Sequence, residues 1–189
     1  MSIREGGGRT PLLQGGARGR AGEPSFVADA MAALRVCESA VFVINGVMGV
    51  EVNTLRVWAR AEEYELSRVV FVNMLDRERA DFFRTLDSLK SSFGPHAVAT
   101  EIPIGSEHEL RGVIDLVDMK AYEYSGTDRD NCKEIAIPDD MAATAQEYRE
   151  KLMDEVAENS DELMEHYLEG KEISHEELIT ALKDGVTGG

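Results

Sequence analysis

The amino-acid sequence predicts an α/β protein in which a parallel sheet is followed by a smaller subdomain of antiparallel strands and helices. Two apolar runs, 40–44 and 69–72, lack the alternation of polar and apolar residues that is typical of a half-exposed strand. Amphipathic segments separate and follow these runs, and repeated strand-helix units favour parallel pairing through right-handed crossovers. After residue 94 the predicted strands become short and close together, which favours antiparallel pairing.

The first half of the chain begins with residues 1–21, which are rich in glycine and are expected to form a disordered leader. The elements predicted next are helices at 24–37, 51–64 and 80–93, and strands at 40–44 and from residue 68. Trp58 lies on the apolar side of the second helix. At helical spacing a tryptophan is more often part of the core than a stacking partner for a ligand, so we expect Trp58 to be core.

The second half of the chain combines short strands with acidic helices. Strands are predicted at 97–103, 110–117, 119–124 and 133–137, and helices at 139–159, 160–168 and 174–184. Ser174 and Glu177 have the spacing of a capping box at the start of the last helix. Most of the acidic residues in this region are expected to form a solvated face, and the alternative is a docking surface for a basic or helical partner.

Composition excludes several classes of function. Acidic residues outnumber basic residues 36 to 20, and the formal net charge of −16 opposes general binding to nucleic acid or to an anionic membrane. No apolar run approaches the roughly 20 residues of a membrane span, and no signal-peptide core is present. A cytoplasmic location is therefore expected. Cys37 and Cys132 lie far apart and are expected to be ordinary free thiols.

The segment from Arg68 to Arg79 carries the candidate binding residues. Asn73 and Asp76 follow an apolar strand, and open α/β sheets bind ligands beyond the carboxyl ends of their strands. A carboxylate can accept hydrogen bonds from both N1-H and N2-H of a guanine, while an amide donates to the N7 or O6 edge. Adenine has no matching pair of donors. The alternative is that Asn73 and Asp76 form a turn that caps the next helix.

The same segment resembles a known family. Residues 71–84, Phe-Val-Asn-Met-Leu-Asp-Arg-Glu-Arg-Ala-Asp-Phe-Phe-Arg, are similar to the guanine-specificity segment of elongation factor G, whose pattern is N-K-x-D followed by Arg and Ala-Asp-Phe. The resemblance runs from about residue 22 to about residue 183. It includes Leu-Arg-Val at 34–36, Gly-Val-Met-Gly-Val-Glu at 46–51, Pro-Ile-Gly at 103–105 and Arg-Gly-Val-Ile-Asp-Leu-Val-Asp-Met-Lys-Ala at 111–121.

The resemblance implies a partial sheet of the P-loop NTPase type with an inserted α+β subdomain. The expected divisions are a leader at 1–21, part of a GTP-binding domain at 22–96, the insertion at 97–184 and a tail at 185–189. The implied nucleotide-binding residues are Asn73, Met74, Asp76 and Gly22. Met74 stands where the family has a Lys that packs along the guanine, so the apolar contact is kept and the charge is lost.

Other family motifs are missing from the sequence. The family's D-x-x-G motif, whose Asp positions Mg2+, corresponds to Gly19-Arg20-Ala21-Gly22, and Glu23 stands where many relatives have a catalytic His. Nothing upstream resembles the phosphate-binding motif G-x-x-x-x-G-K-[ST]. We therefore expect no catalytic and no metal-binding residue in this chain, and we interpret residues before 22 as an unrelated leader joined to a truncated domain.

The predicted function is that of a fragment of an elongation factor G-like GTPase that acts in translation. The complete family binds GTP or GDP with Mg2+, and this chain is expected to bind them weakly or not at all. The expected partners are the ribosome and, through the acidic helices, its stalk protein, with no free nucleic acid and no membrane. The alternative is a non-enzymatic α/β interaction module that has an acidic docking surface.

Overall fold

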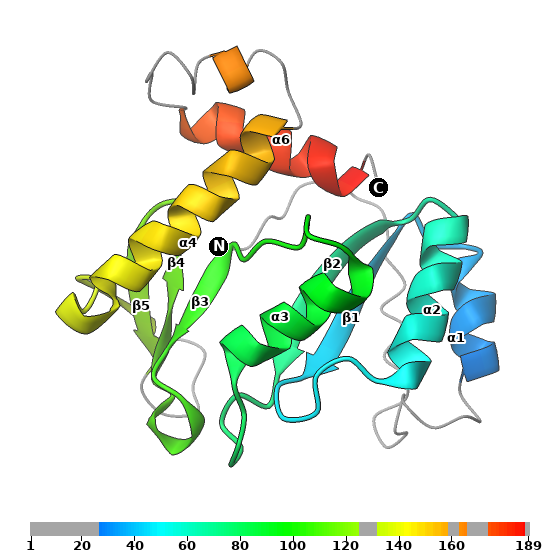
Figure 1. The fold of residues 1–189 in the computed structure, drawn as a ribbon, viewed down its shortest axis with the longest axis horizontal. Helices are drawn as coiled ribbons and strands as arrows, with labels where there is room; N and C mark the ends of the chain where they lie inside the picture. The colour runs from blue at the N-terminus through cyan, green and yellow to red at the C-terminus, as the bar shows by residue number, and fades with distance from the viewer. Residues whose placement is uncertain (1–26, 125–131, 159–162, 166–173, 188–189) are drawn as a thin grey trace.

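The computed structural model describes residues 27–124, 132–158, 163–165 and 174–187 (Figure 1). The predicted leader, Gly22 and Glu23 lie outside these residues, as does most of the helix predicted at 160–168. The first helix, α1 (Val27–Leu34), lies within the predicted range of 24–37. The described chain forms two sheets, a parallel pair and an antiparallel four-stranded sheet, with helices packed around both.

The parallel pair consists of β1 (Ser39–Asn45) and β2 (Ser67–Asn73), joined through α2 (Val52–Glu63). The two strands pair over their whole length, from Ser39 opposite Ser67 to Asn45 opposite Asn73. The predicted parallel pairing is confirmed. Because parallel strands run in the same direction, both strands end at the same edge of the sheet, and both end in an asparagine.

The two faces of this pair differ in their burial. Phe42 and Ile44 of β1 are buried in a core that includes Leu34, Ala61, Leu66 and Leu89. On the opposite face the apolar side chains are exposed, and they are Val41 at 66%, Val43 at 61%, Val69 at 48% and Phe71 at 58%. The described residues thus cover the parallel pair on one face only, although both of its faces are apolar. An apolar run without alternation shows that both faces are apolar, but it does not show that each face has a helix packed on it.

The core beneath β1 and β2 is built around Trp58 of α2. Its ring stacks on Phe93 with the ring centroids 3.9 Å apart, and it lies 4.8 Å from the Phe42 ring. The guanidinium of Arg68 lies over the same indole, 5.0 Å from the ring centroid. Trp58 is half-buried and belongs to the core, as the sequence predicts.

The second sheet is an antiparallel meander in the order β3 (Glu101–Ile104), β4 (Gly112–Asp115), β5 (Lys120–Tyr124) and β6 (Cys132–Ile135). The strand predicted at 97–103 begins later than predicted, at Glu101. Its ladder with β4 begins at Glu101 opposite Asp115, because β4 ends there. Asp115 Oδ1 accepts the N-H groups of Val117 and Asp118, which turns the chain away from the ladder.

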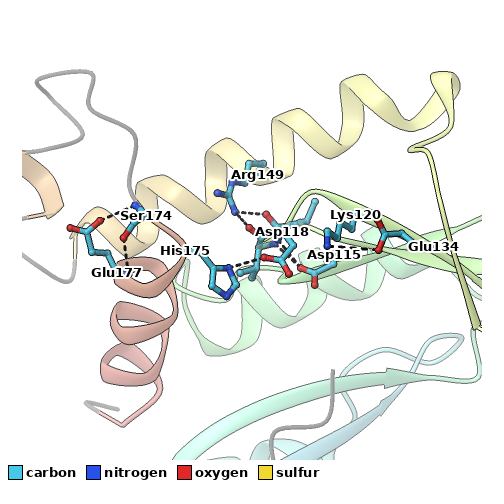
Figure 2. Close-up of polar contacts among 10 residues, drawn as sticks. Asp115, Asp118, Lys120, Glu134, Arg149, Ser174, His175 and Glu177 are labelled. Carbon is cyan, nitrogen blue, oxygen red and sulfur yellow. Dashed lines mark hydrogen bonds and ion pairs between the residues drawn. The ribbon is translucent and has the colours of Figure 1, made fainter.

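Two long helices complete the second half of the chain, α4 (Asp139–Glu158) and α6 (His175–Thr187). Leu152 of α4 and Leu178 of α6 are fully buried against the sheet. The predicted capping box is confirmed: Ser174 N-H donates to Glu177 Oε2 at 2.8 Å, and Glu177 N-H donates to Ser174 Oγ at 3.3 Å (Figure 2).

Polar contacts hold α4 and α6 to the turn between β4 and β5 (Figure 2). Arg149 Nη1 of α4 donates to the carbonyl oxygens of Leu116 and Val117, and His175 Nδ1 of α6 lies 2.7 Å from Asp118 Oδ1. Burial lowers the pKa of Arg149, and the nearby carboxylates of Asp115 and Asp118 oppose that shift. An arginine remains charged under these conditions. Side chains from two helices, α4 and α6, therefore bond to this turn.

The helix α3 (Phe82–Phe93) joins the two halves of the molecule (Figure 1). Its Leu86 is part of the large core formed with the antiparallel sheet, α4 and α6, whereas its Leu89 is part of the core beneath β1 and β2. Phe83 also packs against Tyr148 of α4, with the ring centroids 5.2 Å apart. One helix therefore contributes to both cores.

The register of β3 and β4 generates a prediction about stability. Glu101 and Asp115 are directly opposite each other, and burial together with the charge of Asp115 raises the pKa of Glu101. Like charges in this position are destabilising by up to about 1 kcal/mol. Because the folded pKa of Glu101 exceeds its unfolded pKa, the folded state loses stability as the pH rises through the folded value and the Glu101 carboxyl group ionises. We expect Glu101→Gln to raise the free energy of unfolding at pH 7 and to change it little near pH 3.

Urea unfolding at the two pH values measures this effect. The matched control is Glu134→Gln, because Glu134 Oε2 lies 3.7 Å from Lys120 Nζ on the same sheet and loses an attractive partner instead. The control should leave stability unchanged or slightly reduced at pH 7. A Glu101→Gln variant that is less stable than the wild type at pH 7 would contradict the argument.

Candidate functional site

The candidate site is at the edge where β1 and β2 end. The side chain of Asn45 turns the chain after β1, because its Oδ1 accepts the N-H of Val47 at 2.8 Å and that of Met48 at 3.4 Å. Gly49 N-H donates to the Asn45 carbonyl oxygen at 2.8 Å and closes the turn. Loops that follow parallel strands in this way form the usual ligand-binding edge of an α/β sheet.

Gly46 brings the loop after β1 against the loop after β2. Its N-H donates to the carbonyl oxygen of Asn73 at 2.8 Å, and its own carbonyl oxygen accepts Asp81 N-H at 3.0 Å and Thr85 Oγ1 at 3.2 Å. A Cβ atom at this position would lie 2.8 Å from Leu75 Cδ2 and 3.1 Å from the Asn73 carbonyl oxygen. A larger residue would displace the Leu75 side chain and press on the Asn73 carbonyl oxygen, so glycine allows the closest approach of the two loops.

Asn73 and Met74 start the second loop. Asn73 Oδ1 accepts the N-H of Met74 at 2.8 Å, so the NH2 group is the part of this amide that can donate to a ligand. Met74 has a φ of 62°, in the left-handed region that non-glycine residues seldom adopt. Its side chain is 44% exposed. The turn therefore leaves an amide donor and an apolar side chain at the surface.

Asp76 lies in the same loop with its carboxylate exposed. Its Oδ2 is 3.9 Å from Arg77 Nε, and the Asp76 side chain is 65% exposed. The residue that caps α3 is Asp81, whose side chain accepts the N-H of Arg84 at 3.0 Å. The alternative that Asn73 and Asp76 cap the next helix is therefore wrong. A ligand that approaches this edge would meet the Asp76 carboxylate directly.

Residues that the sequence analysis missed hold this loop in place. Arg84 Nη2 donates to the carbonyl oxygens of Val47 and Arg79, so one guanidinium contacts both loops. Glu107, far along the chain, accepts Arg79 N-H at 2.7 Å with its carboxylate and donates its own N-H to Leu75 O at 3.0 Å. Of the residues that support this loop, Asp81 is the one whose role a local sequence pattern indicates, because it stands as an N-cap residue directly before a helical apolar run.

The predicted binding residues are thus partly brought together. Asn73, Met74 and Asp76 share one loop at the carboxyl end of β2, beside the loop after β1, and Gly22 lies outside the described residues. A carboxylate acceptor and an amide donor are the types of group that can pair with the edge of a guanine. The positions of Asn73, Met74 and Asp76 as ligand-binding residues remain predictions.

A surface cavity of about 540 Å³ lies elsewhere, and its lining residues are Leu34, Arg35, Cys37, Arg60, Glu63, Tyr64 and Leu66. Cys37 precedes β1 and Leu66 precedes β2, so this cavity is at the amino ends of the parallel strands. It is at the opposite edge from Asn73. Ligands of open α/β sheets bind at the carboxyl ends, so the cavity is not the predicted base-binding site.

Comparison with known proteins decides the family. The family model described as the elongation factor Tu GTP binding domain matches residues 20–183. The chain belongs to this family. Elongation factor G of Ureaplasma parvum serovar 3 and that of Ureaplasma urealyticum serovar 10 are each 41% identical to it over 165 residues, which cover 87% of this chain and 24% of each relative. The predicted resemblance to elongation factor G is confirmed.

A solved structure supports the same assignment for the elongation factor Tu GTP-binding domain family. The crystal structure of a protein from Thermus thermophilus matches this chain with a TM-score of 0.79 and 30% sequence identity, covering 89% of this chain and 25% of that protein. The predicted α/β fold of the P-loop NTPase type is therefore confirmed. This chain spans about a quarter of the length of the relatives that it matches.

The described part of the chain contains no helix that is both long enough and apolar enough to cross a membrane. The longest described helix, α4, is 20 residues long and carries many charged side chains.

The buried hydroxyl of Thr85 provides a test of how the site is held. Thr85 is 1% exposed, and its Oγ1 contacts the carbonyl oxygens of Gly46 and of Asp81, the latter at 2.7 Å. Thr85→Val keeps the shape of the side chain and removes the hydroxyl. Both carbonyl oxygens keep a backbone N-H donor, so we expect a loss of about 0.5 to 1.5 kcal/mol in the free energy of unfolding, measured by urea denaturation.

The control for this substitution is Thr180→Val, because Thr180 Oγ1 makes the same type of bond to the Glu176 carbonyl oxygen on the exposed side of α6. It should change stability by less than about 0.5 kcal/mol. Equal effects of the two substitutions would mean that the hydrogen bond from Thr85 to the Gly46 carbonyl oxygen adds no stability of its own.

Proposed function

We propose that the loop from Asn73 to Asp76 recognises the guanine of GTP or GDP. The observation that carries this proposal is that the exposed Asp76 carboxylate and the Asn73 amide belong to one loop, at the carboxyl edge of a parallel sheet, in a chain of a GTP-binding family. In the proposed complex the Asp76 carboxylate accepts N1-H and N2-H of the base, and the Asn73 NH2 group donates to its N7 or O6 edge. Both contacts use groups that the loop leaves at the surface.

Met74 occupies the position between these two groups and takes the place of the family's Lys. Its exposed thioether side chain can lie along the plane of the base, because methionine adapts to flat apolar surfaces. It supplies no charge. We therefore propose that the preference for guanine is kept while the affinity for the nucleotide is reduced, because phosphate contacts normally supply most of that affinity. Gly22 is the residue proposed to lie near the terminal phosphate.

The elongation factor G relatives suggest the wider role. We propose that this chain corresponds to part of a translation factor that acts on the ribosome in the cytoplasm, with a GTP-binding part at 22–96 and an inserted subdomain at 97–184. GTP or GDP with Mg2+ would be bound by the complete factor. The proposed contact with the ribosomal stalk protein is through the acidic side of α4, whose exposed carboxylates include Glu147, Glu150, Asp154 and Glu158.

Calorimetry with GDP and Mg2+ tests the strength of binding. The sequence has no G-x-x-x-x-G-K-[ST] motif and no Asp at the D-x-x-G position. We expect binding weaker than micromolar, which means a free energy less favourable than about −8 kcal/mol. A micromolar or tighter constant for the 189-residue chain would contradict this expectation and would require phosphate contacts from other residues.

Replacement of Asp76 tests base recognition independently of the phosphates. Asp76→Asn places a donor where an acceptor is needed, so we expect the preference to move from guanine toward xanthine nucleotides. Saturation-transfer NMR at millimolar GDP and xanthosine diphosphate measures the preference even when binding is weak. Glu78→Gln is the matched control, since it removes one exposed negative charge from the same loop. Base preference that is unchanged by Asp76→Asn would favour an interaction module without nucleotide chemistry.

A further inference from the structure

A cluster of metal-ligating side chains lies away from the loop at Asn73. His96 follows the end of α3, two residues after the C-cap Gly94, and it begins the connection to β3. Its Nδ1 atom is 2.7 Å from Oε1 of Glu155 on α4. The His96 side chain is 74% exposed and that of Glu155 is 18% exposed. The contact therefore joins the end of one helix to the side of another.

Glu158 adds a third donor to this pair. It is three residues beyond Glu155 on α4, and side chains with this spacing lie on the same face of a helix. One ligand atom from each of His96, Glu155 and Glu158 lies within 4.8 Å of the other two. The three donors come from two separate elements, so the cluster is formed by the tertiary structure and not by a run of acidic residues along one helix.

The chemistry of the donors favours one class of ion. An imidazole nitrogen with two carboxylate oxygens is a ligand set typical of Zn2+ and its transition-metal neighbours, whereas Mg2+ and Ca2+ prefer oxygen donors alone. Zinc ligands lie about 2.0 to 2.2 Å from the ion, so small rotations of the side chains would bring the three donors into its first coordination shell. Water would complete a four-coordinate site.

We propose that His96, Glu155 and Glu158 bind a divalent transition-metal ion of the zinc class. The ion joins the connection between α3 and β3 to the end of α4. Since α3 contributes to both cores, the ion adds a bond between the part of the chain that carries the Asn73 loop and the antiparallel part. This site does not depend on the proposed nucleotide binding.

Titration calorimetry of the full chain with zinc chloride, after removal of metal by a chelator, tests the proposal. We expect one saturable site in the wild type and a loss of roughly tenfold or more in affinity for both His96→Ala and Glu158→Gln. The control is His108→Ala, because His108 is also exposed and lies outside the cluster. Cys37→Ser and Cys132→Ser are further controls, since free thiols also bind zinc.

Thermal unfolding provides the second measurement. Zinc that binds only the folded chain should raise the unfolding temperature of the wild type and of His108→Ala, and it should raise that of His96→Ala much less. Without zinc Glu158→Gln and His108→Ala should unfold as the wild type does, because both side chains are exposed. His96→Ala loses the contact with Glu155 and should be slightly less stable, so its shift on adding zinc is compared with its own zinc-free value. Absence of a saturable wild-type site overturns the proposal. Zinc binding that is unchanged in both His96→Ala and Glu158→Gln also overturns it.

Discussion

The close approach of Gly46 to Asn73 is the constraint on which the candidate site depends. One peptide N-H joins the loops that follow β1 and β2, and the Gly46 carbonyl oxygen accepts two further bonds from the start of α3. These bonds fix three chain segments relative to one another with backbone atoms and one buried hydroxyl. The side chains of Asn73 and Asp76 are then left to face solvent, because the loop that carries them needs neither as a structural support for α3. A site with this arrangement is held in position before a ligand arrives, which lowers the conformational cost of binding.

The helix α3 carries that constraint into the rest of the molecule. Its first turn is bonded to Gly46, its Leu89 packs beneath the parallel strands, and its Leu86 packs with the antiparallel sheet and α4. Glu107, from the segment between β3 and β4, bonds to the loop between β2 and α3. The antiparallel part therefore contacts the Asn73 loop at its backbone as well as through a shared core. Displacement of either part would disturb these hydrogen bonds, so the two parts are expected to be coupled energetically.

Local pattern in the sequence was enough to predict most elements, and non-local contacts account for what it did not predict. The spacing of Ser174 and Glu177 predicted a capping box, and the apolar runs predicted two parallel strands, because both features depend on neighbours in the chain. The late start of β3 depends on where Asp115 turns the chain, and the exposure of Val41 and Phe71 depends on which elements pack over the sheet. In the site, Asn73 and Asp76 could be placed at a strand end, whereas the roles of Gly46, Arg84 and Glu107 require partners more than 20 residues away.

Local charge decides how an anionic ligand meets this edge, despite the net charge of −16. Charges in solvent are screened over about 8 Å at physiological ionic strength. The charged groups nearest to the end of β2 therefore matter more for a ligand there than the net charge of the whole chain. The loop between β2 and α3 carries Arg77 and Arg79 beside the acidic Asp76, Glu78 and Asp81, and Arg84 contacts its backbone from α3. Positive and negative side chains are therefore close to balance at this loop. An acidic protein can in this way repel nucleic acid in general and still present one edge to a nucleotide, with the Asp76 carboxylate offset by the arginines beside it.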